Sequence, residues 1–290
     1  MPVTPGVADL GDVRLHYLEA GDGPLVLCLH GFPDHAPTFR PLLEDLAAAG
    51  FRAVAPFMRG YAPSTVEAST YESAALAGDV LGLVDALGDG PAGVVGHDWG
   101  GIAAQHAAVL APERISRLVT IAIPHAKAFA EALRSDPDQL RRSWYEFLFL
   151  ADGFAERVVS HDAFAFIDRL VAEWSPGGTL EPEDWEAIRR TLGSPGVLTA
   201  ALAYYRCAFL AARRDPVLAE AAARWADPVP VPTLAVVGAD DGCIPPAVSA
   251  RQEQYFPGGY RREVIPGAGH WPHREAPDVV TPLIVDWLCA

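Results

Sequence analysis

The sequence predicts an α/β fold in which a mostly parallel sheet is flanked by helices and interrupted by a helical insertion. Three observations support this fold class. Short apolar strands alternate with helices in the first third, helical periodicity with almost no strand signal fills the middle third, and strands return near the end. We expect two parts of one core at residues 1–125 and 227–290, and an inserted helical cap domain at residues 126–226.

The strands of the first core part are short and apolar. Leu25–Leu29 is a continuous apolar run, which is typical of a strand buried on both faces of a parallel sheet. Val13–Glu19 alternates in polarity, as an edge strand of a hairpin does. The other strands expected here are Arg52–Ala55, Ala92–Val95 and Leu118–Ile123.

Helices are predicted between these strands and throughout the insertion, and several end at a glycine or before a proline. In the first core part they are Thr38–Gly50, Tyr71–Leu87 and Gly100–Leu110. In the insertion they are Gln139–Leu150, His161–Trp174, Glu183–Leu192 and Val197–Arg213. The last part begins with a proline-rich extended linker, Asp227–Pro232. It continues with strands at Thr233–Val237 and Glu263–Ile265 and a closing helix at Pro277–Cys289.

Composition excludes several classes of protein. The 290 residues include 22 basic and 37 acidic ones, a net charge of −15 that repels phosphate backbones and anionic membranes. We therefore expect neither a nucleic-acid nor a membrane partner. The N-terminus lacks the basic and apolar regions of a signal peptide and no apolar run reaches the length of a membrane span, so we expect a cytoplasmic protein. The four cysteines are far apart, which favours free thiols.

The segment from Gly96 to Gly101, Gly-His-Asp-Trp-Gly-Gly, joins a predicted strand to a predicted helix. A sharp turn with glycines around one central residue is typical of a nucleophile elbow, which exposes that residue above the sheet. The central residue is Asp98. The alternative interpretation is a glycine-rich turn in which Asp98 only caps the helix. A phosphate-binding loop is excluded because no Lys-Ser/Thr pair follows the glycines.

An aspartate at an elbow implies different chemistry from a serine. A carboxylate is already ionised at neutral pH and needs no base before it attacks. It displaces a leaving group from a saturated carbon and becomes an ester, which an activated water must then hydrolyse. Epoxides and alkyl halides suit such a nucleophile, whereas esterase activity is not expected.

Three further segments supply the partners of such a nucleophile. His30-Gly31-Phe32-Pro33 follows a buried strand, and the backbone N–H groups of Phe32 and Trp99 are expected to form an oxyanion hole. Pro33 is a candidate cis proline. Gly238-Ala239-Asp240-Asp241 offers two acids that could orient a histidine, and spacing alone leaves both open. Gly267-Ala268-Gly269-His270 places a histidine on a glycine-rich loop. The order nucleophile, acid, histidine is that of the α/β-hydrolase fold.

Taken together, these segments resemble the α/β-hydrolase-fold epoxide hydrolases, and the resemblance covers nearly the whole chain. The segments His30–Pro33, Arg59–Ser64, Gly96–Gly101 and Gly267–His273 are similar to motifs of that family. The resemblance implies an Asp-His-Asp catalytic triad of Asp98, His270 and, by family spacing, Asp241. It also implies a mechanism that requires no cofactor and no metal, with a small apolar epoxide as substrate. The oligomeric state stays open between monomer and homodimer.

The same family uses two tyrosines of the cap as hydrogen-bond donors to the epoxide oxygen. Ser143–Leu150 resembles the segment that bears the first and nominates Tyr145, with Trp144 as a substrate-binding neighbour. Ala203–Arg206 resembles the second and nominates Tyr205, with Tyr204 as the alternative. His30 and Pro33 are further substrate-binding candidates. Aromatic residues in apolar helices are otherwise more often part of the core.

Departures from the family pattern leave the substrate open. Leu150 stands where the family usually has glutamine, Ala62 replaces a glycine, and Phe57 stands in place of a common aspartate. Two rival functions remain. A haloalkane dehalogenase shares the aspartate elbow and would use Trp99 with Trp144 or Trp174 to bind halide. A hydrolase-fold module that binds a ligand with little turnover is the other.

Overall fold

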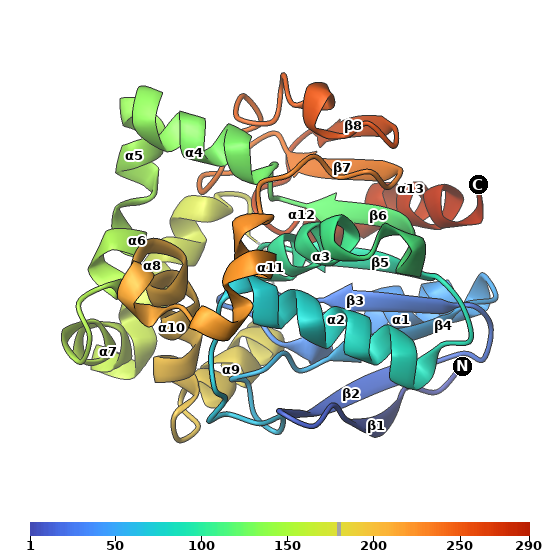
Figure 1. Cartoon of the computed structure of the whole chain (residues 1–290). Coiled ribbons are helices and arrows are strands. Elements are labelled where there is room, and N and C mark those ends of the chain that lie inside the picture. Colours follow the sequence, from blue (N-terminus) through green and yellow to red (C-terminus); the bar gives the residue numbers. More distant parts are fainter. Residues whose placement is uncertain (179–180) are drawn as a thin grey trace.

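The computed structural model describes residues 1–178 and 181–290, which contain an eight-stranded sheet in the order β1-β2-β4-β3-β5-β6-β7-β8 (Figure 1). β2 is antiparallel to β1 and β4, and the other neighbouring pairs are parallel. The predicted α/β fold class is therefore confirmed. The strands are Thr4–Asp9 (β1), Arg14–Ala20 (β2), Leu25–Leu29 (β3), Arg52–Pro56 (β4), Ala92–His97 (β5), Ile115–Ile121 (β6), Thr233–Gly238 (β7) and Tyr260–Ile265 (β8).

Helices cover both faces of this sheet. In Figure 1, α2 and α3 lie in front of the strands, while α1 and α13 lie behind them. The alternation of side chains along a strand explains the two layers. Leu27 and Leu29 of β3 belong to the apolar cluster shared with α2 and α3, and Val26 and Cys28 belong to the cluster shared with α1 and α13. These core helices are Arg40–Ala48 (α1), Ser73–Leu87 (α2), Trp99–Leu110 (α3), Pro272–Glu275 (α12) and Pro277–Cys289 (α13).

A helical segment connects β6 to β7 and lies at the carboxyl ends of the parallel strands, toward which the arrowheads of β3 and β6 point (Figure 1). In a parallel sheet this edge collects the loops that follow the strands, and ligands bind there. The helices are Ala126–Ser135 (α4), Pro137–Arg142 (α5), Trp144–Phe149 (α6), Phe154–Ser160 (α7), Ala165–Trp174 (α8), Pro182–Leu192 (α9), Val197–Phe209 (α10) and Ala219–Ala223 (α11).

Several predicted helix limits were wrong, each for a local reason. The helix expected over Gln139–Leu150 is broken at Ser143, where α5 ends and α6 begins. The helix expected from His161 starts at Ala165, because the three residues before it have positive φ angles. The helix expected to reach Arg213 ends at Phe209, since Leu210 is extended. β1 and helices α4, α7 and α11 were not predicted individually.

All four cysteines are free thiols. Cys28, Cys207 and Cys243 are buried free thiols, and Cys289 is an exposed one. The prediction of free thiols is confirmed.

Among the described residues, no helix has both the length and the apolar character needed to cross a membrane.

The start of α3 packs directly against the end of β3, and this contact requires glycine. A Cβ at Gly100 would overlap the backbone carbonyl of Leu29. We expect Gly100→Ala to lower the free energy of unfolding by about 3 kcal/mol, the upper end for over-packing, because both partners are backbone. Chemical denaturation measures this change.

Gly78 is the matched control, because it lies in the middle of α2 with open space around its missing Cβ. Gly78→Ala should raise the free energy of unfolding by roughly 0.5–1 kcal/mol through helix propensity. Equal effects at Gly78 and Gly100 would contradict the importance of the contact between α3 and β3.

Candidate active site

Asp98 lies at the turn between β5 and α3 in a strained conformation. Its backbone angles, φ 50° and ψ −121°, are rare for a residue that carries a side chain. The Phe32 N–H, from the loop after β3, donates to Asp98 Oδ1 at 2.8 Å. Trp99 is the first residue of α3, so its N–H is one of the unpaired donors at a helix N-terminus. Strain of this kind is typical of functional sites, where the surroundings hold a residue in place.

His270 and Asp241 complete a buried charged group with Asp98. His270 Nδ1 lies 2.9 Å from Asp241 Oδ2, and His270 Nε2 lies 3.7 Å from Asp98 Oδ2. The N–H groups of Cys243 and Ile244 both donate to Asp241 Oδ1, which fixes the orientation of that carboxylate. The structure thus brings together Asp98, His270 and Asp241.

The two candidate acids differ sharply in position. Asp241 is buried beside His270, whereas Asp240 is exposed at the surface. The alternative that the sequence left open is therefore decided by burial, since only Asp241 contacts the imidazole.

The charges of His270 and Asp98 depend strongly on each other. Burial opposes a charge on His270, but Asp241 and Asp98 together raise its pKa from 6.5 to about 10. Burial likewise opposes the carboxylate of Asp98, but hydrogen bonding and the charge of His270 hold the pKa of Asp98 below its ordinary value. At neutral pH the group therefore consists of one imidazolium between two carboxylates.

The histidine loop and the acid loop are both tied to the helical segment. At the end of α8, the carbonyl oxygen of Trp174 accepts hydrogen bonds from the N–H of Gly242 and from the N–H of His270. The Ser175 hydroxyl also accepts from His270 N–H at 2.8 Å. The backbone of the helical segment thus sets the relative position of the two loops.

Tyr145 of α6 and Tyr205 of α10 face each other beside Asp98. Their ring centroids are 6.0 Å apart, and the ring of Tyr205 packs edge-on against Phe32 and Trp99. The Tyr145 hydroxyl lies 3.4 Å from Cys243 Sγ, directly after the acid loop. Burial raises the pKa of both phenols well above the ordinary value, so both remain proton donors at neutral pH.

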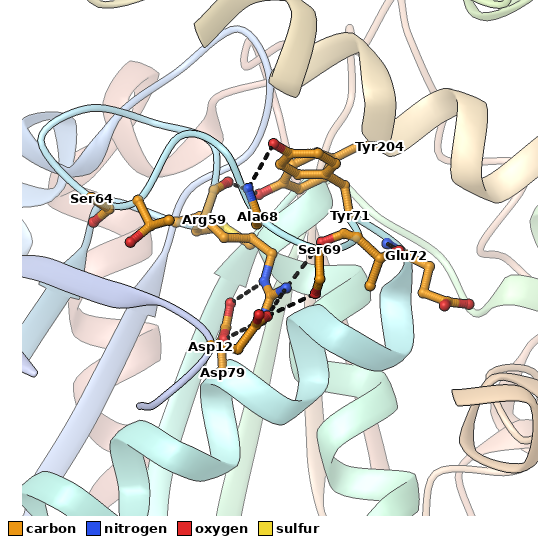
Figure 2. A network of polar contacts seen from close by, with 12 residues as sticks. Asp12, Arg59, Ser64, Ala68, Ser69, Tyr71, Glu72, Asp79 and Tyr204 are labelled. Carbon is orange, nitrogen blue, oxygen red and sulfur yellow. Dashed lines mark hydrogen bonds and ion pairs between the residues drawn. The ribbon is translucent and has the colours of Figure 1, made fainter. Parts of the chain in front are cut away.

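Tyr204, the alternative to Tyr205, takes part in a different network (Figure 2). Its hydroxyl donates to the carbonyl oxygen of Arg59 at 2.6 Å. The Arg59 guanidinium is in turn paired bidentately with Asp79 and lies 3.2 Å from Asp12. Tyr204 therefore anchors the loop that contains Arg59 against α2 and α10, and it is not brought to Asp98.

The other predicted binding residues, Pro33, His30 and Trp144, lie in three different surroundings. Pro33 follows a cis peptide bond next to the Phe32 N–H donor, which confirms the prediction of a cis proline. His30 is buried beneath the site, where its ring nitrogens contact the backbone at Gly31 and Met58. Trp144 is 45% exposed and packs against Phe166. The structure does not bring Trp144 to Asp98, because it points from α6 toward solvent.

A mostly apolar cavity of about 310 Å³ opens beside Asp98. Asp98, Tyr145 and Tyr205 line one end of it, and apolar side chains of α3, α4 and the loop after Asp241 form much of its wall. A cavity of this size holds a small organic molecule with few polar groups. The apolar lining residues include Ile102, Ile123, Phe129, Leu133, Phe209, Trp225 and Ile244.

One group of described residues has the atom types of a metal site. Asp34, His97 and His273 are buried together behind His270, with their ligand atoms within 4.8 Å of one another. His97 Nε2 contacts the carbonyl oxygen of His270 at 2.9 Å, and the Trp271 indole donates to Asp34. Both contacts hold the histidine loop, and the group lies outside the cavity that Asp98 lines.

Comparison with known proteins agrees with this geometry. Residues 24–277 match the family model of the alpha/beta hydrolase fold. Epoxide hydrolase 3 of Xenopus tropicalis is 34% identical over 95% of this chain and 75% of its own length. The chain belongs to the epoxide hydrolases of the α/β-hydrolase fold.

Solved epoxide hydrolases share the whole architecture with this α/β hydrolase. A putative epoxide hydrolase from Klebsiella pneumoniae superposes with a TM-score of 0.87 at 26% identity, covering 99% of this chain and 98% of that one. The epoxide hydrolase of Bacillus megaterium, solved with an inhibitor, gives a TM-score of 0.85 at 26% identity, covering 98% of this chain and 100% of that one.

The cavity of this α/β hydrolase contains ionisable groups that the sequence did not reveal, namely Glu146, Glu72 and Arg214. Glu146 follows Tyr145 in α6, is only 5% exposed, and lines the cavity together with Asp98. Its signal in the sequence was an acid inside the aromatic run Trp144–Phe149. Because half of a surface helix normally carries polar residues, that signal is weak without the orientation of α6.

The charge coupling in this α/β hydrolase can be tested directly. Asp98→Asn removes one of the two negative neighbours of His270, so we expect the pKa of His270 to fall well below the wild-type value of about 10. An NMR titration of the imidazole measures it. Asp240→Asn, at the exposed neighbour of Asp241, should leave that pKa unchanged. An unchanged pKa in Asp98→Asn would refute the coupling.

Proposed function

We propose that this protein hydrolyses epoxides to vicinal diols through a covalent ester on Asp98. The observation that carries this proposal is the position of an aspartate at the elbow, with two tyrosines opposite it and a His-Asp pair behind it. A carboxylate nucleophile suits a saturated carbon, and two phenols suit a developing alkoxide. The membership in the epoxide hydrolase family supports the same reaction.

In the first step, Asp98 Oδ2 attacks a ring carbon while Tyr145 and Tyr205 hold the epoxide oxygen. Oδ1 is held by the Phe32 N–H, which leaves Oδ2 as the attacking atom. The carbon–oxygen bond of the ring breaks, and one tyrosine gives its proton to the alkoxide. The resting imidazolium of His270 favours this step, because it keeps Asp98 ionised in a buried site.

Esterification then converts His270 into a base. The ester carries no charge, so one of the two carboxylates that raise the pKa of His270 is neutralised. The imidazolium loses a proton and the phenolate left by ring opening regains one, so the tyrosine is restored and His270 becomes neutral. Neutral His270, oriented by Asp241, takes a proton from water as the water attacks the ester carbonyl.

The tetrahedral intermediate places its negative charge on Oδ1, where the Phe32 N–H already lies and where we assign the Trp99 N–H as second donor. The diol leaves as an alkoxide and takes up the proton of the new carboxyl group. Asp98 carboxylate and protonated His270 are thereby regenerated, and no metal or organic cofactor takes part in the sequence.

We assign residues 126–226 the role of a cap domain over a core of residues 1–125 and 227–290. The position of α4–α11 at the carboxyl ends of the strands supports this division, as does the contribution of Tyr145 and Tyr205 from α6 and α10. A cytoplasmic location is proposed as well, and the buried free thiols of Cys28, Cys207 and Cys243 are consistent with a reducing compartment.

The rival functions have less support. Trp144 is exposed, and Trp174 packs against Trp271, so neither is among the residues that line the cavity beside Asp98. A halide site at Trp99 would therefore lack both of the tryptophan partners that the dehalogenase hypothesis names, and the other tryptophan of the cavity lining is Trp225. The ligand-binding alternative predicts negligible turnover, which the following experiments measure.

The ester intermediate should accumulate when His270 is replaced. In His270→Gln the attack of Asp98 continues but water is not activated, so intact-mass spectrometry should show one added epoxide mass. Peptide mapping should place it on Asp98, and Asp98→Asn should show none. In a single turnover of wild type in ¹⁸O-water, label should enter Asp98 before the diol. Label in the first diol with none in Asp98 would refute the covalent route.

The tyrosines should be needed for ring opening. Tyr145→Phe and Tyr205→Phe remove a proton donor and should each lower kcat/KM by roughly 10²- to 10⁴-fold. Tyr204→Phe is the matched control on α10, since its hydroxyl donates to the Arg59 carbonyl. It should keep the rate near that of wild type and lower the free energy of unfolding by about 1 kcal/mol. A greater loss of rate at Tyr204 than at Tyr205 would reverse the assignment.

A further inference from the structure

We propose that Glu146 is a specificity residue that binds a hydroxyl or amino group on the substituent of the epoxide. The preferred substrates are then epoxides that carry a hydrogen-bond donor, instead of the plain apolar epoxides expected from the sequence. This inference rests on the proposed function for the identity of the reacting group.

Glu146 lies in the cavity itself. It is 5% exposed and lines the cavity with Asp98, Tyr145 and Tyr205, while much of the remaining wall is apolar. A carboxyl group in such surroundings is costly unless a partner satisfies it. Ser143 and Tyr145 are side-chain hydrogen-bond partners of the Glu146 carboxyl within the protein. A ligand inside the cavity is in a position to supply a further partner.

The protein does not provide a cation for Glu146 among the described residues. The nearby arginines of α5 are used elsewhere, because Arg141 pairs with Asp138 and Arg142 donates to the Gly242 carbonyl. Burial and the negative charge of Asp98 raise the pKa of Glu146 from 4.5 to about 8. At neutral pH this carboxyl therefore both donates and accepts hydrogen bonds, as a hydroxyl or amino group requires.

Glu146 is not needed at the epoxide oxygen. An ether-type oxygen has two lone pairs, and the hydroxyls of Tyr145 and Tyr205 match both of them. A third donor would have no acceptor site left. Glu146 is consequently free to bind a polar group elsewhere on the same substrate.

A second acid in the cavity, Glu72, also favours a substrate that carries a hydrogen-bond donor. Glu72, at the start of α2, lines the cavity and is only 3% exposed. Its Oε1 accepts from the Asp215 N–H, whereas its Oε2 has no partner among the described residues. Figure 2 shows the Glu72 carboxylate turned away from Arg59, whose guanidinium is already paired with Asp79.

The charges around the cavity disfavour anionic substrates. Three acids, Asp98, Glu146 and Glu72, line it, and the one arginine in its lining, Arg214, donates to the backbone carbonyls of Cys207 and Ala208. A carboxylate on the substrate would meet the negative charge of Asp98 at the reacting end. A hydroxyl or ammonium group meets acceptors instead.

The test compares chain-matched terminal epoxides that end in a methyl, hydroxyl or carboxylate group. In wild type we expect kcat/KM for the hydroxyl substrate to exceed that for the methyl substrate by about 10-fold, one good hydrogen bond, and the carboxylate substrate to be poorest. Glu146→Met should abolish or reverse the hydroxyl-to-methyl ratio. Glu146→Gln, which keeps shape and hydrogen-bonding capacity, should retain most of it. Circular dichroism and thermal melting verify that both variants are folded.

Equal turnover of the hydroxyl and methyl substrates by wild type would overturn the inference, and so would an equal loss on both in Glu146→Met. The product diols, with and without the terminal hydroxyl, repeat the comparison by calorimetry without any turnover. If no epoxide yields diol but the hydroxyl-ended ligand still binds about 10-fold tighter in a Glu146-dependent manner, the proposed function fails and the binding role stands. Equal affinities would remove the role of Glu146.

Discussion

One positive charge, on His270, allows two carboxylates to be buried in the same site. Asp98 and Asp241 both lie beside the imidazole, and either one alone would be costly to bury as an anion. The rest of the site maintains this arrangement: backbone N–H groups fix the acid, and the elbow fixes the nucleophile. When the charge of Asp98 changes, the proton affinity of His270 changes with it, so nucleophile and base act in turn.

The core could be predicted from sequence because its determinants are local. Buried parallel strands are continuous apolar runs, and the elbow needs glycine wherever backbones meet, as at Gly100 beside Leu29. Asp98 and Asp240 or Asp241 follow such strands, while His270 follows the less buried edge strand β8. The carboxyl ends of parallel strands meet at one edge of the sheet. The residues alone could not separate Asp240 from Asp241, which only the spacing of the family favoured, since the difference is one of burial, which depends on the loop around Cys243.

The helical segment could be predicted only in outline, because its details depend on tertiary contacts. The break at Ser143 rotates α6 relative to α5, and no proline or glycine marks it in the sequence. That break determines that Tyr145 and Glu146 line the cavity while Trp144 faces solvent. Aromatic residues at neighbouring positions of one helix look alike in sequence, and only the packing partner distinguishes them. The positions of α6 that line the cavity were thus among the least predictable.

A single carbonyl group has consequences for how this architecture can change. The Trp174 carbonyl, at the end of α8, accepts from Gly242 beside the acid and from His270 itself. The helical segment is therefore not an interchangeable lid, because its backbone forms part of the scaffold on which the triad is assembled. Replacing it by a segment from another protein would disturb the triad unless the end of α8 were kept. Variation at the cavity-lining positions of α4, Phe129 and Leu133, leaves the hydrogen bonds of the Trp174 carbonyl in place, and new substrate ranges can arise there while the rest of the site is preserved.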